Sequence, residues 1–219
     1  MPLTDRLRAR HHGLWQKVVA HPFVEEMGDG TLPTEKFRAY FVQDYIFVRD
    51  LVSLVALGVS KAPDPDAAGR LNRFLAGILD PENDLFVRAF GALGVSNEAY
   101  ASAAATPTTR AFGDFLVRVG HEGRFEEIVT ALYVTEGTYL DWGTRLGTDH
   151  SPRNEVYQEW VDIHGPAVLG ELVRWMGTVV DGAESNGPSG RIEDVFLTAL
   201  RYEYLFFESA YRGESWPDR

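Results

Sequence analysis

The stretch GDGTLPTEKFRAYFVQDYIFVRDLVSLVALGVSKAP, residues 28–63, decides the fold class. After the turn-forming GDG, apolar side chains recur every three or four residues up to Pro63, which is the period of one face of an α-helix. One acid, Asp44, lies in the middle of that apolar face. The stretch therefore predicts a long helix whose buried side carries a carboxylate.

Helical periodicity also dominates the rest of the chain, whereas strand-like alternation of useful length is absent. We therefore expect one all-α domain, residues 1–219, built as a helical bundle. The dipeptide Asp80-Pro81 resembles a helix N-cap followed by Pro, so we expect the third helix to restart or kink there. The other predicted helices cover about residues 4–20, 65–94, 107–120, 124–146, 154–164, 166–180 and 191–211, and the loop GAESNGPSG precedes the last of them.

Composition excludes several classes of protein. With 45% hydrophobic and 24% charged residues the chain is typical of globular proteins, and its net charge of −11 with scattered Lys and Arg argues against a nucleic-acid partner. No apolar run approaches the ~20 residues of a membrane span, and the N-terminus lacks a secretory apolar segment, so we expect a cytoplasmic protein. The absence of Cys excludes disulfides, thiolate metal sites and a cysteine nucleophile.

Two more acids repeat the pattern of Asp44. Glu203 lies at the centre of the apolar face of residues 191–211, and Glu136 lies on that of residues 124–146, with Thr135 beside it. A buried carboxylate needs a donor, a counter-charge or a proton. Each acid alone is compatible with a structural role, satisfied by a Tyr or Trp. Three acids on faces that converge in a bundle favour a polar cavity in the core.

The residues around this cavity limit what it holds. Di-metal bundles use Glu-x-x-His pairs, and none of the six His follows a Glu by three residues. The adjacent His11 and His12 are more typical of a surface than of a haem site, and neither a G-x-S-x-G elbow nor a P-loop occurs. We expect no metal and no cofactor. An aromatic pocket with carboxylates suits a flat, nitrogen-rich ring that donates hydrogen bonds, and buried acids suit acid/base catalysis.

Several motifs resemble the TenA/thiaminase II family of thiamin-salvage enzymes. They are HPFVEEMGDGTLP, FRAYFVQDY, GRFEEIVTALYVTEGTYLDWGTRL, VYQEWVDIHG and RYEYLFFESAY, and the resemblance extends from His21 to Trp216. It implies the haem-oxygenase-like all-α fold without bound haem, assembled as a homodimer or homotetramer, and a small pyrimidine as the ligand.

The resemblance also implies roles for single residues. Asp44 corresponds to the acid that binds the aminopyrimidine ring and its amino group, and Glu203 to the general acid/base. Thr135 occupies the position of the family's nucleophilic Cys, while Phe47 and His164 replace pocket tyrosines. The chain is similar in this respect to the Cys-lacking TenA-E branch, which converts formylaminopyrimidine or aminopyrimidine to hydroxymethylpyrimidine.

The lost cysteine leads to a specific hypothesis. Glu136, adjacent to its position, would activate water directly, so that C–N bond hydrolysis proceeds by general acid/base catalysis. Two alternatives stay open: a pyrimidine-binding or regulatory protein without catalysis, and an oxidase of the same fold. Further pocket candidates are Tyr133, Tyr139, Tyr202 and Glu82, although Tyr at helical spacing is usual in a core and acids are favoured in a first turn.

Overall fold

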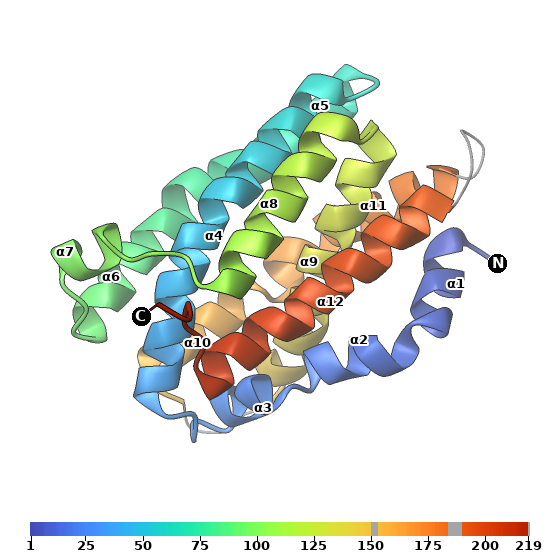
Figure 1. Cartoon of the computed structure of the whole chain (residues 1–219). Helices are drawn as coiled ribbons and strands as arrows, with labels where there is room; N and C mark the ends of the chain where they lie inside the picture. The colour runs from blue at the N-terminus through green and yellow to red at the C-terminus, as the bar shows by residue number, and fades with distance from the viewer. Residues whose placement is uncertain (150–152, 184–189, 219) are drawn as a thin grey trace.

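The computed structural model describes residues 1–149, 153–183 and 190–218, and this part of the chain is an all-α bundle without a strand, which confirms the predicted fold class (Figure 1). No helix in these ranges is long and apolar enough to cross a bilayer. The elements are α1 (Leu3–Arg10), α2 (His12–Val19), α3 (Pro22–Gly28), α4 (Thr34–Lys61), α5 (Pro65–Gly77), a π-helical turn η1 (Ile78–Glu82), α6 (Asn83–Ala92), α7 (Asn97–Ala101), α8 (Pro107–Glu122), α9 (Phe125–Gly147), α10 (Glu155–Ile163), α11 (Pro166–Gly182) and α12 (Gly190–Arg212).

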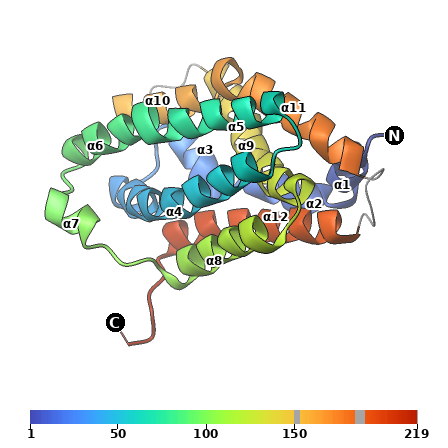
Figure 2. The same cartoon turned by 90° about the horizontal axis from the view of Figure 1, so that it is seen from above.

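The helices are arranged in layers, which Figure 2 shows from above. On one side α5 and α6 lie with α10 and α11, on the other lie α8 and α12, and α4 and α9 run between them. The segment α1 to α3 lies alongside α12 and contacts it through α2 and α3 (Figure 1). The three helices that carry the central acids, α4, α9 and α12, all contact one another. Their apolar faces therefore converge.

Helix α9 is the centre of the bundle. Residues 127–138 of this helix are buried without interruption, whereas a surface helix buries only one stripe. It packs mainly against α11 and α12, and also contacts α4, α8 and α10. A polar residue on any side of α9 therefore faces other helices, which is why Glu136 is 8% exposed although it is ionisable.

Side-chain caps fix where several helices begin. Oγ1 of Thr106 accepts a hydrogen bond from the Thr109 amide at 3.3 Å, and Pro107 occupies the first helical position, as the sequence predicts. Nδ1 of the buried His21 accepts from the Phe23 amide at 3.1 Å, so an imidazole caps α3. Its Nε2 then carries the proton and donates to Glu208 at 3.0 Å. These caps set the ends of the helices that surround the core.

The structure differs from the sequence-based expectation at four places. The first helix is broken at His11, whose φ of −106° and ψ of 18° separate α1 from α2. Of the restart or kink expected at Asp80-Pro81, the restart does not occur, because the chain continues there as a π-helical turn. Pro81 lacks an amide hydrogen, and a widened turn accommodates such a residue inside a helix. The short helices α3 and α7 were not expected, and most of the predicted loop 182–190 lies outside the described residues.

Candidate active site

A cavity of about 570 Å³ lies inside the bundle, lined from α4, α5, η1, α6, α8, α9, α10, α11 and α12. These elements are far apart in the sequence, so only the folded chain creates the site. Eight of the ten predicted site residues line the cavity: Asp44, Phe47, Glu82, Thr135, Glu136, Tyr139, His164 and Glu203.

Asp44 forms the α4 side of the cavity and is 5% exposed. Burial raises the pKa of its carboxyl to about 8, with a further contribution from the charge of Glu136. A hydrogen bond from Tyr40, one turn earlier, favours the ionised form and opposes this rise. The hydroxyls of Tyr40 and Tyr139 are 2.7 Å apart. When Tyr40 donates to Asp44, Tyr139 therefore donates to Tyr40, which links α4 to α9.

Glu136 lies on α9 next to Thr135, the residue at the position where the family resemblance places a cysteine. Burial raises the pKa of its carboxyl to about 7, and a hydrogen bond from Thr135 acts in the opposite direction. Oγ1 of Thr135 lies 3.1 Å from Oε1 of Glu136 and 3.1 Å from the carbonyl oxygen of Leu132. The single hydroxyl proton of Thr135 can serve either acceptor. When it donates to Glu136, the Thr135 hydroxyl helps to orient that carboxylate.

Glu203 and Glu82 complete a set of four acids. Glu203 on α12 is 2% exposed and makes no hydrogen bond within the described chain. Burial makes the largest contribution to raising the pKa of its carboxyl well above the usual range, and the negative charges of Glu136 and Asp44 raise it further. Burial likewise raises the pKa of Glu82, with the charges of Asp44 and Glu136 adding to the effect.

Four acids in one cavity cannot all ionise near neutral pH, because each negative charge raises the pKa of its neighbours. Some of them therefore keep a proton and can donate it, while an ionised neighbour accepts one. This is the combination that general acid/base catalysis requires. Within the described residues, no three His, Asp or Glu side chains have the spacing of a metal site.

His164 is held neutral at the end of α10. Its Nδ1 lies 2.8 Å from the carbonyl oxygen of Trp160, and burial lowers its pKa to about 4. Nδ1 therefore carries the proton and donates, which leaves Nε2 as an acceptor. A Cβ added to Gly143 of α9 would lie 2.4 Å from the His164 carbonyl oxygen, so this close approach requires glycine.

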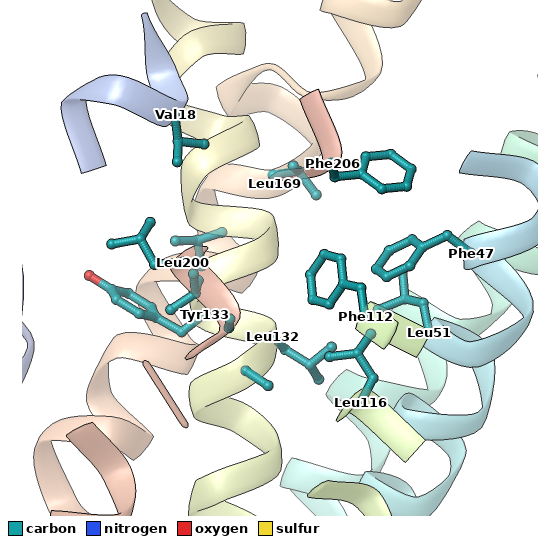
Figure 3. Packing of buried hydrophobic residues seen from close by; sticks show 14 of the residues in the cluster. Val18, Phe47, Leu51, Phe112, Leu116, Leu132, Tyr133, Leu169, Leu200 and Phe206 are labelled. Carbon is teal, nitrogen blue, oxygen red and sulfur yellow. The ribbon is translucent and has the colours of Figure 1, made fainter. Parts of the chain in front are cut away.

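Tyr133 and Tyr202 do not line the cavity. Tyr133 projects from the other side of α9, away from Phe47 and Phe112 (Figure 3), where it packs near Trp15. Tyr202 stacks on the outer side of Phe112, with ring centroids 5.2 Å apart. Apolar periodicity does not distinguish these positions from the cavity, because α9 is buried all round and α12 packs on both α8 and α9.

Other cavity residues were not among the predicted ones. Phe112 and Phe206 provide aromatic walls, and Phe206 follows Glu203 by three residues, a helical spacing that could have identified it. Trp160 precedes His164 by four residues and lines the same wall. At the opening, the exposed Arg88 forms two hydrogen bonds to Glu159, of 2.6 and 3.1 Å. No sequence signal connects these two residues.

Comparisons with known proteins agree with this architecture. An aminopyrimidine aminohydrolase from Halalkalibacterium halodurans is 29% identical, with 99% of this chain and 98% of that protein aligned. One from Helicobacter pylori is 26% identical over 97% of this chain and 100% of that protein. The solved structure of a TenA homologue from P. horikoshii superposes with a TM-score of 0.86 at 28% identity, covering 97% of this chain and 100% of that one.

The match extends to the family level. The sequence model of the TENA/THI-4/PQQC family matches residues 8–213, which include every residue of the cavity described above. With the solved TenA homologue, this match identifies the bundle as the haem-oxygenase-like all-α fold. The chain therefore belongs to the TENA/THI-4/PQQC family.

Proposed function

We propose that this protein is an aminopyrimidine aminohydrolase of thiamin salvage, which acts on an aminopyrimidine or its N-formyl derivative. The observation that carries the proposal is the aromatic cavity with Asp44, Glu136 and Glu203 on three converging helices. The relatives called aminopyrimidine aminohydrolase align over nearly the full chain, and the absence of Cys requires a route without a thiolate.

In this mechanism the pyrimidine ring packs against Phe47 and Phe206, and Asp44 accepts hydrogen bonds from its amino edge. Glu136 removes a proton from water, the water oxygen bonds to the methylene carbon, and the C–N bond breaks. Glu203 gives its proton to the departing nitrogen. Water and the aminomethyl compound thus yield a hydroxymethyl compound and ammonia. The raised pKa of Glu203 supports its role as the acid, and the pKa of about 7 of Glu136 suits a base near neutrality.

The test is ammonia release from aminomethylpyrimidine by the purified protein and by the Glu136→Gln/Glu203→Gln double variant. We expect turnover by the wild type and none by the variant. Bound substrate should raise the thermal unfolding midpoint of both proteins. Binding without product in the wild type would support the non-catalytic alternative. Full turnover by the double variant would contradict the mechanism.

We further propose a homodimer or homotetramer without a nucleic-acid partner. The net charge of −11 opposes phosphate binding. The proposed assembly is the one that the resemblance to the TenA/thiaminase II family implies. Light scattering coupled to size exclusion would measure the mass, and a mass of 24.5 kDa for the main species would contradict assembly.

A further inference from the structure

Tyr40 connects two residues of the cavity lining from behind. It is completely buried and does not line the cavity, whereas Asp44 and Tyr139 both do. Its hydroxyl oxygen lies 2.7 Å from that of Tyr139, and it forms a hydrogen bond with Asp44, one turn further along α4. The indole of Trp160 packs edge-on against Tyr40, with ring centroids 6.1 Å apart, and forms a further hydrogen bond with it. The Tyr40 hydroxyl therefore joins α4, α9 and α10 at one point.

The two tyrosine rings are held in place. Phe207 stacks on Tyr40 and on Tyr139, with ring centroids 5.8 Å apart in each case. Burial raises the pKa of both tyrosines well above the usual range, so each hydroxyl keeps its single proton. What can still change is the direction in which each proton points.

The number of protons determines these directions. The indole nitrogen of Trp160 can only donate, so Tyr40 accepts that hydrogen bond. Tyr40 then has one proton for two further neighbours, and an ionised Asp44 is the stronger acceptor, because hydrogen bonds to a charged group are stronger than those between neutral groups. Tyr40 thus donates to Asp44 and accepts from Tyr139. The proton of Tyr139 points away from the cavity, and its oxygen offers a ligand only lone pairs.

A protonated Asp44 permits the opposite directions. Its own proton can be donated to Tyr40, whose proton is then available to Tyr139. Tyr139 in turn becomes free to donate into the cavity. The hydrogen-bonding character of Tyr139 therefore depends, through Tyr40, on the charge of a residue on another helix.

Tyr139 lies beside the place where the proposed reaction occurs. It follows Glu136 by three residues on α9, a spacing that makes two side chains neighbours on a helix. Water held by Glu136 bonds to the methylene carbon in that reaction, and the amino group leaves from the same carbon. An amino group has N–H bonds to donate, and Tyr139 accepts in the state in which the ring is bound to an ionised Asp44.

We propose that Tyr40 is a positioning residue for this reaction: through its hydroxyl, binding of the ring at Asp44 makes Tyr139 the hydrogen-bond acceptor for the reacting amino group. The inference rests on the proposed function, because it takes the positions of the ring and the amino group from it. The hydrogen bond to Tyr139 fixes the orientation of the amino group, so that the nitrogen lone pair can meet the proton of Glu203. Tyr40 does not reach the ligand and acts only through Asp44 and Tyr139.

Asp44 does not titrate in isolation, so the test compares variants at matched pH. The titratable groups nearest to it in the site are Tyr40 on its own helix, Glu136 and Tyr139 on α9, Glu203 on α12, Glu82 on η1 and His164 on α10. The other charged residues of the lining are Arg70, Arg73, Arg88, Glu159 and Glu171. Tyr40→Phe changes only the first of these groups, and the titration of the ligand itself is common to all variants.

The experiment measures by calorimetry how tightly hydroxymethylpyrimidine, the product of the proposed reaction, binds to wild type and Tyr40→Phe at pH 7 and pH 9. Loss of the hydrogen bond from Tyr40 raises the pKa of Asp44, which is about 8 in the wild type, so binding then requires a higher pH. The variant should bind about tenfold more weakly at pH 7, but less than about threefold more weakly at pH 9.

Tyr157→Phe is the matched control. It removes an equally buried hydroxyl, which donates to the carbonyl oxygen of Leu32 at 3.1 Å and does not line the cavity. This variant should keep the wild-type ratio of the affinities at the two pH values.

A second ligand tests the direction of the Tyr139 proton. In Tyr40→Phe this proton loses its partner behind the lining and can be donated to the ligand. The methyl ether of hydroxymethylpyrimidine has an oxygen that accepts but cannot donate. In Tyr40→Phe its affinity relative to hydroxymethylpyrimidine should therefore rise at least about threefold. In Tyr139→Phe this gain should be absent.

The outcomes separate the coupling from a structural defect and from the proposed function. Equal losses of affinity at both pH values in Tyr40→Phe, or an unchanged preference between the two ligands, would overturn the coupling even if the wild type releases ammonia. Both expected effects in Tyr40→Phe, with no ammonia release by the wild type, would support the coupling and overturn the aminohydrolase function.

Discussion

The cavity has two unlike walls. The deep wall consists of α4, α9 and α12, continuous helices of 28, 23 and 23 residues, and its acids are at most 8% exposed. The outer wall consists of α5, η1 and α6, of 13, 5 and 10 residues, and its acid Glu82 is partly exposed among surface arginines. The comparison suggests a division of work. Burial raises the pKa of all four acids, but the continuous helices nearly exclude their acids from solvent, whereas the interrupted helix leaves Glu82 partly exposed.

The largest expected effect is on chemistry at the deep wall. Glu203→Gln should lower ammonia release by roughly 10²–10⁴-fold, because the amide keeps the shape of the side chain but gives up no proton to the leaving group. The matched change at the opening, Glu159→Gln, removes an acid that is 40% exposed and should cost less than about fivefold. Steady-state ammonia assays measure both. Similar losses of ammonia release in the two variants would show that the acids of the deep wall and of the opening do not differ in their contribution to catalysis.

The second effect concerns stability. Leu132 of α9 is completely buried, and Leu132→Ala should lower the free energy of unfolding by about 2–5 kcal/mol, because it removes packed atoms and leaves a void. Leu79→Ala, at a side chain of η1 that is 56% exposed, should change it by less than about 0.5 kcal/mol. Urea denaturation of both variants provides the comparison. A cost at Leu79 equal to that at Leu132 would show that η1 is packed as firmly as the deep wall.

The difference between the walls also explains what could be predicted from the sequence. Periodicity predicted α4, α9 and α12, and with them the convergence of Asp44, Glu136 and Glu203, because burial of one face is a local property of a helix. The same reasoning failed at Asp80-Pro81, since a proline signals an interruption without saying whether the chain turns or widens into a π-helical turn. Tyr202 and Phe112 both lie at positions whose local sequence pattern is that of a buried helix face. Phe112 lines the cavity and Tyr202 stacks on it, and this difference arises from the packing of α8 against α12.

The third effect is a pH dependence of stability that originates in the deep wall. Burial raises the pKa of Glu136 from 4.5 to about 7, so the folded state holds a proton that the unfolded state releases. The stabilisation is therefore complete below pH 4.5 and is lost as the pH rises through about 7. The free energy of unfolding should therefore fall by on the order of 1–3 kcal/mol as the pH rises through this range. Glu136→Gln, which is neutral at every pH, should flatten this decline.

Urea denaturation at pH 5 and pH 8 measures this effect in the wild type and in Glu136→Gln. Asp84→Asn is the control, since an exposed carboxylate should leave the decline as it is in the wild type. An equally steep decline in Glu136→Gln would mean that the other acids of the cavity account for the whole dependence.

The smallest effect belongs to the ion pair at the opening. Arg88 and Glu159 are 60% and 40% exposed, although their closest atoms are only 2.6 Å apart. Water screens such a pair and competes for its hydrogen bonds, so short distances do not imply a large contribution to stability. Arg88→Ala should shift the thermal unfolding midpoint by no more than about 2 °C, and added salt should reduce the shift further. A larger, salt-insensitive shift would show that the opening is covered in solution, and the outer wall would then resemble the deep one.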